Sequence, residues 1–324
     1  GDDPFPGEAN QLEGEAVDEA AIEKMLTGLH QAPLGLDRDD AFRISVAGAQ
    51  EKTALLWSDG RWIKPHGTTP TTHIIKTQIG ELPGGIDLSD SVENEYFCLK
   101  LVEAFGLPVN AAAIETFGET KALVIERFDR RWTRDGRLLR LPQEDCCQAL
   151  SVPPTLKYQS EGGPSMVDVL ELLKGSDTPT GDQDIFFKAQ IIFWLIGATD
   201  GHAKNFSIFL SPGGGYRLTP LYDIVTAQPA LVARQIERKQ MKMAMSVGNS
   251  RHYRFDRIHG RHFVQTAMRA GLSKNRAISI VEEIAAKAPE ALDKTLGALP
   301  TDFPPMIAEA VRGALMDRLR GLEI

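Results

Sequence analysis

The feature that most constrains the fold of this chain is a change of sequence pattern near Gln143. Before it, short apolar runs separated by turn residues predict strands, as a meander or small antiparallel sheet, around one helix at 91–107. After it, most segments have helical spacing, interrupted by one predicted hairpin at about 206–221. We therefore expect an α+β fold with a β-rich N-terminal lobe and a mostly helical C-terminal lobe.

The same pattern places the domain boundaries. Residues 1–18 are acidic and rich in turn formers, which indicates a flexible linker or a cut end. Residues 19–145 are predicted as the β-rich lobe and residues 146–324 as the helical lobe. Small ligands usually bind in a cleft at such a junction.

Composition narrows the class of protein. The 324 residues carry a net charge of −8, whereas a chain that binds nucleic acid directly usually has a basic excess. The longest apolar runs are too short to cross a bilayer. Three cysteines, two of them adjacent, form neither a disulfide framework nor a metal motif, so we expect a reduced, cytoplasmic setting.

The predicted hairpin brings together three polar residues. Asp200 and Asn205 precede it and Asp223 follows it, and the "PGGG" run supplies the turn. The spacing Asp-x(4)-Asn is that of a protein-kinase catalytic loop, in which the aspartate accepts a hydroxyl proton and the asparagine binds metal. A carboxylate one hairpin later would be a second oxygen ligand for Mg²⁺. Each of the three taken alone is better explained as a cap, surface or turn residue, and it is the apolar helix before Asp200 and the strands before Asp223 that favour a site.

A kinase also needs a cation for the phosphates of ATP. Lys76 ends the apolar run "THIIK" and is the candidate, and the following helix offers Glu95, or Glu93, as its partner. The alternative is a solvated lysine and an exposed glutamate.

No glycine-rich phosphate motif is present. The segment "SVAGAQEK" occupies the place of a phosphate-covering loop between two predicted strands. Its small residues Ala47, Gly48 and Ala49 would let backbone N–H groups approach phosphate, with Gln50 beside them and Lys52 adding charge. The residues by themselves favour an ordinary hairpin turn.

Several ordered blocks together resemble the HipA family of serine/threonine-protein kinase toxins. They cover residues 40 to 230 densely: "FRISVAGAQEKTALL", "TTHIIK", "SVENEYFCL", "ERFDRRW", "LPQEDCCQ" and "IGATDGHAKNFSIFL…YRLTPLYDIVTA". The resemblance implies a two-lobed, protein-kinase-like fold and a toxin–antitoxin module. It also implies ATP and Mg²⁺ as cofactors, a HipB-like helix-turn-helix antitoxin as partner, and DNA contact only through that antitoxin. The implied substrate is an aminoacyl-tRNA synthetase, typically glutamyl-tRNA synthetase, whose phosphorylation halts translation and promotes persistence.

The resemblance also assigns roles to residues. Asp200 corresponds to the catalytic aspartate, Asn205 and Asp223 to the metal ligands, and Lys76 to the lysine on the ATP phosphates. Ser45 corresponds to the autophosphorylated serine, whose modification is expected to expel the loop and inactivate the kinase, since it adds about two negative charges near ATP. The remaining implied ATP contacts are the hinge residues Glu126, Arg127 and Phe128 and, in the catalytic block, His202 and Lys204.

One departure from the family pattern leaves alternatives open. HipA proteins usually carry about a hundred further N-terminal residues, and these are missing here. The chain is either a fragment or similar to the shorter HipT branch, for which the implied target is tryptophanyl-tRNA synthetase. Two other classes remain: a kinase-like scaffold that acts as co-repressor with little catalysis, and a Mg²⁺-dependent nuclease or phosphatase.

Overall fold

The computed structural model describes residues 12–29, 50–82 and 85–324. The chain divides into two compact units that are interleaved in sequence. The first unit comprises residues 1–82, 88–92 and 110–141, and the second comprises residues 83–87, 93–109 and 142–324. The sequence pattern predicts a single boundary after residue 145, whereas the packing assigns residues 93–109 to the second unit.

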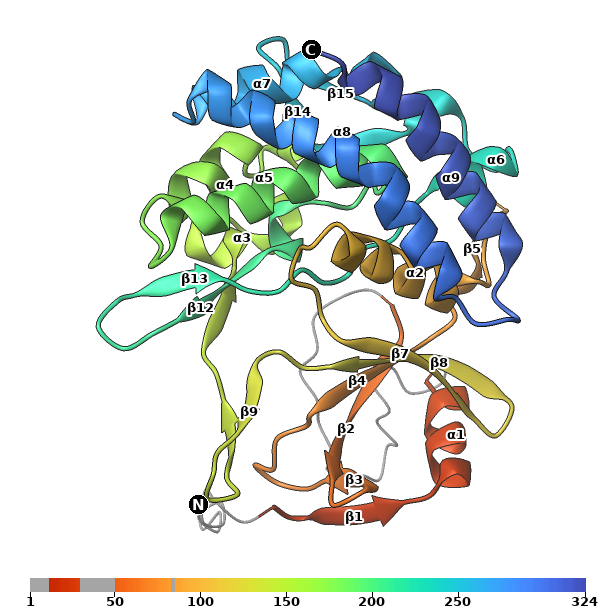
Figure 1. Ribbon diagram of the computed structural model, residues 1–324. Helices are drawn as coiled ribbons and strands as arrows, with labels where there is room; N and C mark the ends of the chain where they lie inside the picture. The colour runs from red at the N-terminus through yellow and green to blue at the C-terminus, as the bar shows by residue number, and fades with distance from the viewer. Residues whose placement is uncertain (1–11, 30–49, 83–84) are drawn as a thin grey trace. The chain divides into compact units, whose positions relative to one another are not determined.

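A six-stranded antiparallel sheet forms the centre of the first unit, counted over the described residues (Figure 1). The spatial order is β1-β3-β2-β4-β8-β7. Because β4 pairs with β2 and not with β3, the sheet is not a meander but matches the other expectation, a small antiparallel sheet. The strands are β1 (Gly14–Val17), β2 (Lys52–Ser58), β3 (Arg61–Pro65), β4 (His73–Thr77), β7 (Ala112–Phe117) and β8 (Thr120–Glu126).

Strand β1 corrects the prediction that residues 1–18 are a linker. Residues 14–17 pair antiparallel with β3, and the backbone N–H of His66 donates to the carbonyl of Glu13 at 2.9 Å. Gly14 suits this position because a Cβ there would lie 2.5 Å from Cγ2 of Ile63. Backbone pairing with a distant strand therefore overrides an acidic local sequence that has little strand propensity.

Helix α1 (Glu19–Thr27) covers one face of this sheet (Figure 1). Asp18 caps the helix by accepting a hydrogen bond from the backbone N–H of Ala21. The buried side chains between helix and sheet are Ile22, Leu26, Leu29, Leu55, Ile75, Phe117, Ala122 and Val124. This cluster is the core that fixes the register of the strands.

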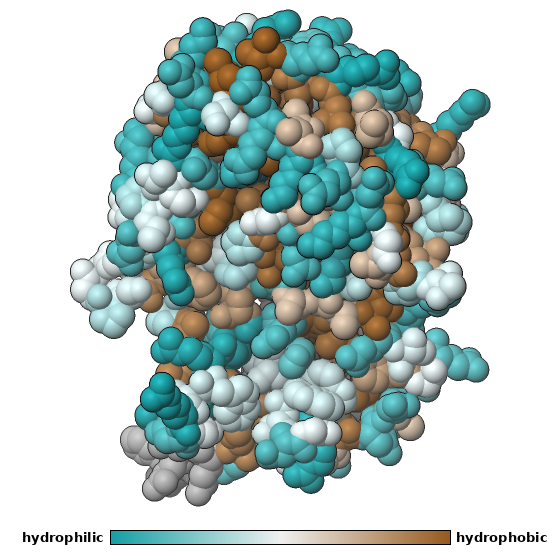
Figure 2. Space-filling view, viewed as in Figure 1, coloured by the Kyte–Doolittle hydropathy of each residue, from teal (hydrophilic) through white to brown (hydrophobic). Residues whose placement is uncertain are grey.

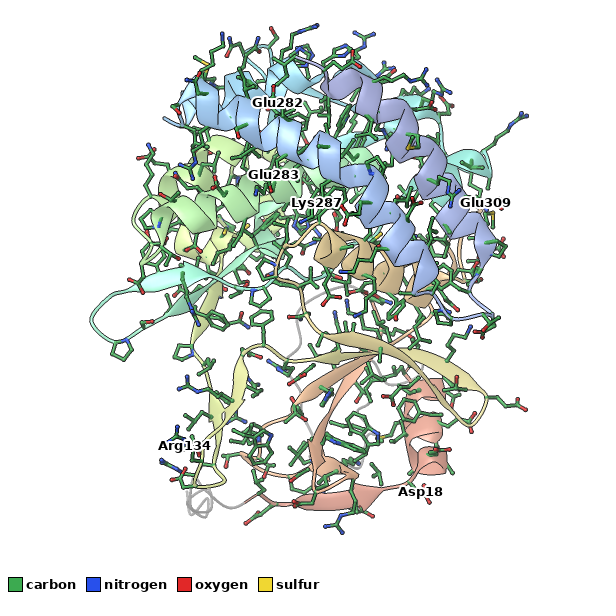
Figure 3. All side chains as sticks on the ribbon, viewed as in Figure 1. Asp18, Arg134, Glu282, Glu283, Lys287 and Glu309 are labelled. Carbon is green, nitrogen blue, oxygen red and sulfur yellow. The ribbon has the colours of Figure 1, made fainter. Side chains whose placement is uncertain are left out.

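A second ribbon, β9 (Arg130–Trp132) with β10 (Leu138–Arg140), completes the first unit; Arg134 lies at its turn (Figure 3). Strands β5 (Gly80–Leu82) and β6 (Ile86–Leu88) are short. Helix α2 spans Ser91–Ala104.

The second unit is mostly helical and is organised around α5 (Pro179–Ile196). This helix is apolar nearly all round, as expected for a helix buried on every side, and it packs against α4, α8 and α9. The other α-helices that the structure describes in the second unit are α3 (Cys146–Ala149), α4 (Met166–Leu173), α6 (Gln228–Val232), α7 (Gly260–Arg269), α8 (Lys274–Gly297) and α9 (Pro305–Leu319).

Two small antiparallel sheets complete the second unit. Strands β11 (Gln143–Asp145), β12 (Ser207–Leu210) and β13 (Tyr216–Leu218) form one, and β14 (Lys242–Val247) with β15 (His252–Arg254) forms the other. The β12–β13 hairpin is the one expected from sequence. The β14–β15 hairpin was not expected.

Polar residues lie on the outer surface of the helices. Glu282, Glu283 and Lys287 follow one another along α8 (Figure 3), and Glu283 forms a 2.6 Å ion pair with Lys188 of α5. Hydrophilic side chains make up most of the face shown in Figure 2. In the described part of the chain, no helix combines the length and apolar character needed to cross a membrane.

Candidate active site

Two backbone closures hold Asp200, Asn205 and Asp223 on one pair of facing loops. The β12–β13 hairpin closes the inner end, where the N–H of Thr219 donates to the carbonyl of Ser207 at 2.9 Å. An antiparallel bridge between Ala198 and Thr226 closes the outer end. The segments 199–206 and 220–225 therefore face each other over a short span. This arrangement confirms the expected hairpin but adds a second closure that spacing did not predict.

The outer closure is secured by residues from three elements. Gly197 ends α5 with φ +79, and a Cβ there would lie 2.9 Å from Oε1 of Gln228, so the position requires glycine. Thr226 donates from Oγ1 to the carbonyl of Ile196 at 2.6 Å. Asn94 of α2 both accepts from the N–H and donates to the carbonyl of Thr226, each at 2.9 Å. These bonds fix the chain on either side of the two aspartates.

Asp200 lies on the first of these loops with its side chain 46% exposed, so a substrate hydroxyl has access to it. The hydroxyl of Tyr158 donates a hydrogen bond to Oδ1 of Asp200. Burial and the neighbouring carboxylate of Asp200 raise the pKa of Tyr158 well above its ordinary value, which keeps the phenol protonated as a donor. Oδ2 is then the oxygen available to accept a proton from a substrate.

His202 is buried beneath this carboxylate. Its Nε2 lies 3.6 Å from Oδ1 of Asp200, and the ring of Tyr158 packs edge-on at 5.0 Å between centroids. Burial lowers the pKa of His202, and Lys157 lowers it further, whereas the carboxylates of Asp200 and Asp223 act in the opposite direction. Neither ring nitrogen has a hydrogen-bond partner among the described residues. His202 is therefore a neutral, structural neighbour of both carboxylates.

Asn205 and Asp223 have the donor chemistry that Mg²⁺ prefers. The side-chain Nδ2 of Asn205 donates to the carbonyl of Asp200 at 2.9 Å, which leaves its Oδ1 as the acceptor. The described residues contain no cluster of three His, Cys, Asp or Glu side chains able to hold a metal. One amide and one or two carboxylates nevertheless fit Mg²⁺, because this ion retains waters and binds substrate phosphates.

Two lysines of the first unit lie opposite each other. Lys52 of β2 and Lys76 of β4 are directly paired in the strand register, so their side chains emerge on the same face of the sheet. The register places them on the face opposite α1, and both are buried, at 4% and 5% exposure. Gln50 lies beside them and donates from Nε2 to the carbonyl of Thr77 at 2.9 Å. The register therefore brings two cationic side chains to the same face of the sheet.

The expected hinge segment follows β8. Glu126 is exposed at the end of the strand, and the guanidinium of Arg127 is occupied by Asp129, with bonds of 2.9 and 2.8 Å. The backbone N–H of Arg127 donates to the carbonyl of Thr72 at 2.8 Å. The side chain of Arg127 therefore stabilises the first unit, and an ATP contact by the segment from Glu126 to Phe128 stays a prediction.

The structure places the remaining predicted residues as follows. Lys204 forms an ion pair with Asp145 at 2.7 Å, while Asp145 also caps α3, so Lys204 anchors the Asp200 loop to that helix. An ATP contact by Lys204 or His202 stays a prediction. Glu95 is buried in α2 and belongs to the second unit, whereas Lys76 belongs to the first. Ser45, Ala47, Gly48 and Ala49 lie outside the described residues.

Two residues of the site were missed by the sequence analysis. Tyr158 contacts Asp200 from 42 positions earlier in the chain, and Asn94 reaches Thr226 across 132 positions. In the sequence, the motif that contains Asn94 draws attention only to its flanking glutamates, Glu93 and Glu95. No local spacing relates either residue to its partner, so only the fold brings them together.

Comparisons with known proteins identify the family. Residues 44–292 match the family model described as the HipA-like C-terminal domain. "Putative kinase Y4mE" of Sinorhizobium fredii is 39% identical over 253 residues, which cover 76% of this chain and 56% of that protein. The serine/threonine-protein kinase toxin HipA of Shewanella oneidensis is 30% identical over 273 residues, covering 80% of this chain and 58% of the toxin. The chain thus spans little more than half the length of these relatives.

Solved structures agree with this assignment. The toxin in the complex of Shewanella oneidensis HipA, HipB and operator DNA superposes with a TM-score of 0.77 and 26% identity, over 99% of this chain and 74% of that one. The Helicobacter pylori proinflammatory kinase CtkA, at 12% identity and a TM-score of 0.54, shares the fold alone. The predicted α+β, kinase-like fold class is confirmed. Because the family model matches more than half of this chain, the chain belongs to the HipA family and carries the C-terminal, kinase-like domain of that family.

Proposed function

We propose that this chain is the catalytic part of an ATP- and Mg²⁺-dependent serine/threonine protein kinase of the toxin class. The observation that carries the proposal is the doubly closed pair of loops, which presents Asp200, Asn205 and Asp223 within one small region. Relatives that are named kinases support the same reading.

The proposed roles follow from the contacts of each residue. Oδ2 of Asp200 accepts the proton of a substrate hydroxyl, while the hydrogen bond from Tyr158 holds the carboxylate in a fixed orientation. Neutral His202 supports the loop from below and adds no positive charge that would weaken Asp200 as a base. Asn205 and Asp223 offer one amide and one carboxylate oxygen to Mg²⁺.

ATP bound with Mg²⁺ would supply the phosphoryl group, whose transfer requires positioning and charge neutralisation rather than covalent help from the protein. Lys76 and Lys52 are proposed to neutralise the phosphates, since the strand register places both cations on one face of the sheet. Gln50, the segment from Glu126 to Phe128 and the loop containing Ala47, Gly48 and Ala49 are further proposed contacts to the nucleotide.

The substrate and partner are proposed from family membership. We infer an aminoacyl-tRNA synthetase as substrate, with glutamyl-tRNA synthetase first and tryptophanyl-tRNA synthetase as the alternative. Its phosphorylation would halt translation and promote persistence. A HipB-like antitoxin would neutralise the kinase and provide the contact to DNA, and autophosphorylation of Ser45 would inactivate it.

A second candidate is a co-repressor scaffold with weak catalysis. The Shewanella relative was solved with HipB and operator DNA, which favours a role of this kind beside the antitoxin. The chain nevertheless retains all four groups that phosphoryl transfer is expected to need, which argues against a scaffold that has lost catalysis. They are Asp200, Asn205, Asp223 and Lys76.

Incubation with γ-labelled ATP, Mg²⁺ and cell lysate tests the proposal. We expect label on a synthetase, and on Ser45 of the chain itself, identified by mass spectrometry. Asp200→Asn should reduce labelling at least about 100-fold, because it removes the general base. Asp293→Asn, an exposed aspartate on α8, is the matched control and should label normally. Release of free phosphate without labelled protein would indicate a hydrolase. If no Mg²⁺-dependent reaction occurred, the co-repressor scaffold would be the function that remains.

A further inference from the structure

A basic pocket of about 570 Å³ adjoins the Asp200 loop within the second unit. Its size is within the range of ligand-binding sites. One wall contains Tyr158 and Thr199, the first of which bonds to Asp200 and the second of which precedes it in sequence. Another wall is the β14–β15 hairpin, which is tied to the Tyr158 segment because the N–H and Oγ of Ser246 both donate to Oε1 of Gln159, at 2.7 and 3.0 Å.

The charge of this pocket is opposite to that of the chain as a whole. Four cationic side chains line it, Lys242, Arg251, Arg254 and Arg257, beside the carboxylate of Glu161. Arg254 forms a bidentate pair with Asp256, with bonds of 3.0 and 2.6 Å.

The other three cations are available to a ligand. Lys242, Arg251 and Arg257 are exposed, and none forms an ion pair within the described part of the chain. In a protein with a net charge of −8, a concave group of cations beside Asp200 provides a local positive potential that attracts an anionic ligand.

We propose that this pocket binds acidic side chains of the protein substrate close to its acceptor serine or threonine. The inference rests on the proposed kinase function and specifies the sequence context that this kinase accepts. Because Tyr158 contacts Asp200 and also lines the pocket, a peptide whose hydroxyl reaches Asp200 would place its neighbouring residues there, at about 3.4 Å per extended residue. Arginine side chains suit this role, since each binds a carboxylate through two parallel bonds.

The pocket favours a peptide over a nucleic acid. Single-stranded nucleic acid is bound by a groove that combines cations with several stacking aromatic rings. Here the Tyr158 ring already packs against His202, and the His252 ring stacks on His262 with 4.1 Å between centroids. Two of the three rings that line the pocket are therefore engaged within the protein, and Tyr253 by itself does not make the series of stacking rings that single-stranded nucleic acid requires.

Binding of labelled peptides tests the ligand class without requiring catalysis. Three fluorescent peptides share one serine and differ only in flanking residues, which are Glu, Gln or Lys. We expect the Glu peptide to bind at least about tenfold more tightly than the Gln peptide at low salt, and the difference to shrink at about 0.5 M salt. In the double variant R251E/R257E, the ratio of the affinities for the Glu and Gln peptides should fall about tenfold. R312E, an exposed arginine of α9, is the matched control and should keep it.

The outcomes separate the two proposals. Asp200-dependent phosphorylation of all three peptides at equal kcat/KM would overturn the acidic subsite and leave the kinase function intact. Selective binding of the Glu peptide that depends on Arg251 and Arg257, without any phosphoryl transfer, would support the pocket and remove the kinase function. If a single-stranded RNA bound through Arg251 and Arg257 more tightly than the Glu peptide, the peptide assignment would be wrong. Thermal denaturation of each variant confirms that loss of binding does not reflect unfolding.

Discussion

Asp223 combines a strained backbone conformation with a side chain that is proposed to bind metal. Its φ of +58 lies in the left-handed region, which residues other than glycine adopt at a cost and which Asp and Asn tolerate best. Such strain persists where the surrounding structure imposes it, here between the bridges at Leu221 and Thr226. The backbone at this position thus suits aspartate or asparagine better than most residues other than glycine, and the proposed metal contact adds the need for a carboxylate.

Two substitutions of Asp223 separate these requirements. Asp223→Asn should keep the free energy of unfolding within about 1 kcal/mol, because Asn also adopts the left-handed region. Asp223→Ala should be about 1 kcal/mol less stable than Asp223→Asn. Both should lose at least about 100-fold in Mg²⁺-dependent phosphorylation, since a metal ligand contributes several kcal/mol. Urea denaturation and labelled-ATP turnover measure the two effects, and full turnover by Asp223→Asn would contradict the metal assignment.

At the residue scale, sequence spacing could predict the groups that carry the chemistry but not those that orient them. Asp200, Asn205 and Asp223 stand at fixed offsets from a hairpin, and the hairpin is as expected. Tyr158 and Asn94 act through contacts that span 42 and 132 positions. Such contacts leave no periodic signal in a single sequence.

At the element scale, a buried ion cluster follows strand β8. Asp129 accepts from Arg127 and from Arg130, whose Nη1 lies 2.7 Å from Oδ2, and Arg130 also donates to the carbonyl of Thr71 at 3.0 Å. Burial raises the pKa of Asp129, but the bonds and charges of the two arginines outweigh it and hold the pKa below its ordinary value. Burial and the neighbouring Arg127 lower the pKa of Arg130 to about 10 despite Asp129, so Arg130 stays charged at neutral pH.

Asp129 should therefore stabilise the first unit in a pH-dependent way. Because its folded pKa is lowered, its contribution is complete above the ordinary value of 3.8 and falls as pH drops through the folded pKa. Asp129→Asn should cost about 3 kcal/mol at neutral pH, since it leaves two buried guanidinium groups without their carboxylate. The difference from wild type should narrow toward about pH 2.

Denaturation of both proteins across this pH range is the measurement. Asp135→Asn, which removes an exposed ion pair with Arg137 on the adjacent β9–β10 ribbon, is the control and should leave the Tm unchanged. A gap between Asp129→Asn and wild type that stays constant with pH would contradict the assignment of the effect to ionised Asp129.

Elements with a strong apolar period were predictable, and elements held by pairing were not. Helices α4, α5, α7, α8 and α9 lie where the helical spacing placed them. Strand β1 was missed because its four residues are exposed and form a strand only through backbone bonds to β3. The β14–β15 hairpin was missed because β14 is buried at nearly every position, so its sequence lacks the alternation of a half-buried strand.

At the scale of the whole molecule, charge separates two classes of ligand. The chain carries a net charge of −8, and its cationic pocket is confined to part of one unit. Binding to a duplex requires many phosphate contacts and a broad basic surface. The overall charge therefore opposes direct binding of DNA while the pocket still accepts a short acidic peptide.

We expect the chain alone to bind duplex DNA with a Kd weaker than about 100 μM at physiological salt, the weak end of non-specific binding. Fluorescence anisotropy with a labelled duplex checks this, and the same measurement after addition of a HipB-like antitoxin should show tight binding. A tight, salt-sensitive complex formed by the chain alone would contradict the assignment of DNA contact to the antitoxin.

The sequence alone determined the change from a strand-rich to a helical pattern, the acidic net charge and the hairpin between Asn205 and Asp223. These features follow from apolar periodicity, from charge and from turn residues, all of which are local. Only the tertiary structure decided that Lys52 faces Lys76, that Tyr158 holds Asp200, and that four cations surround one pocket. The physical reason is that strand register and long-range packing depend on the energy of the whole fold, so residues far apart in the chain meet only when both have formed.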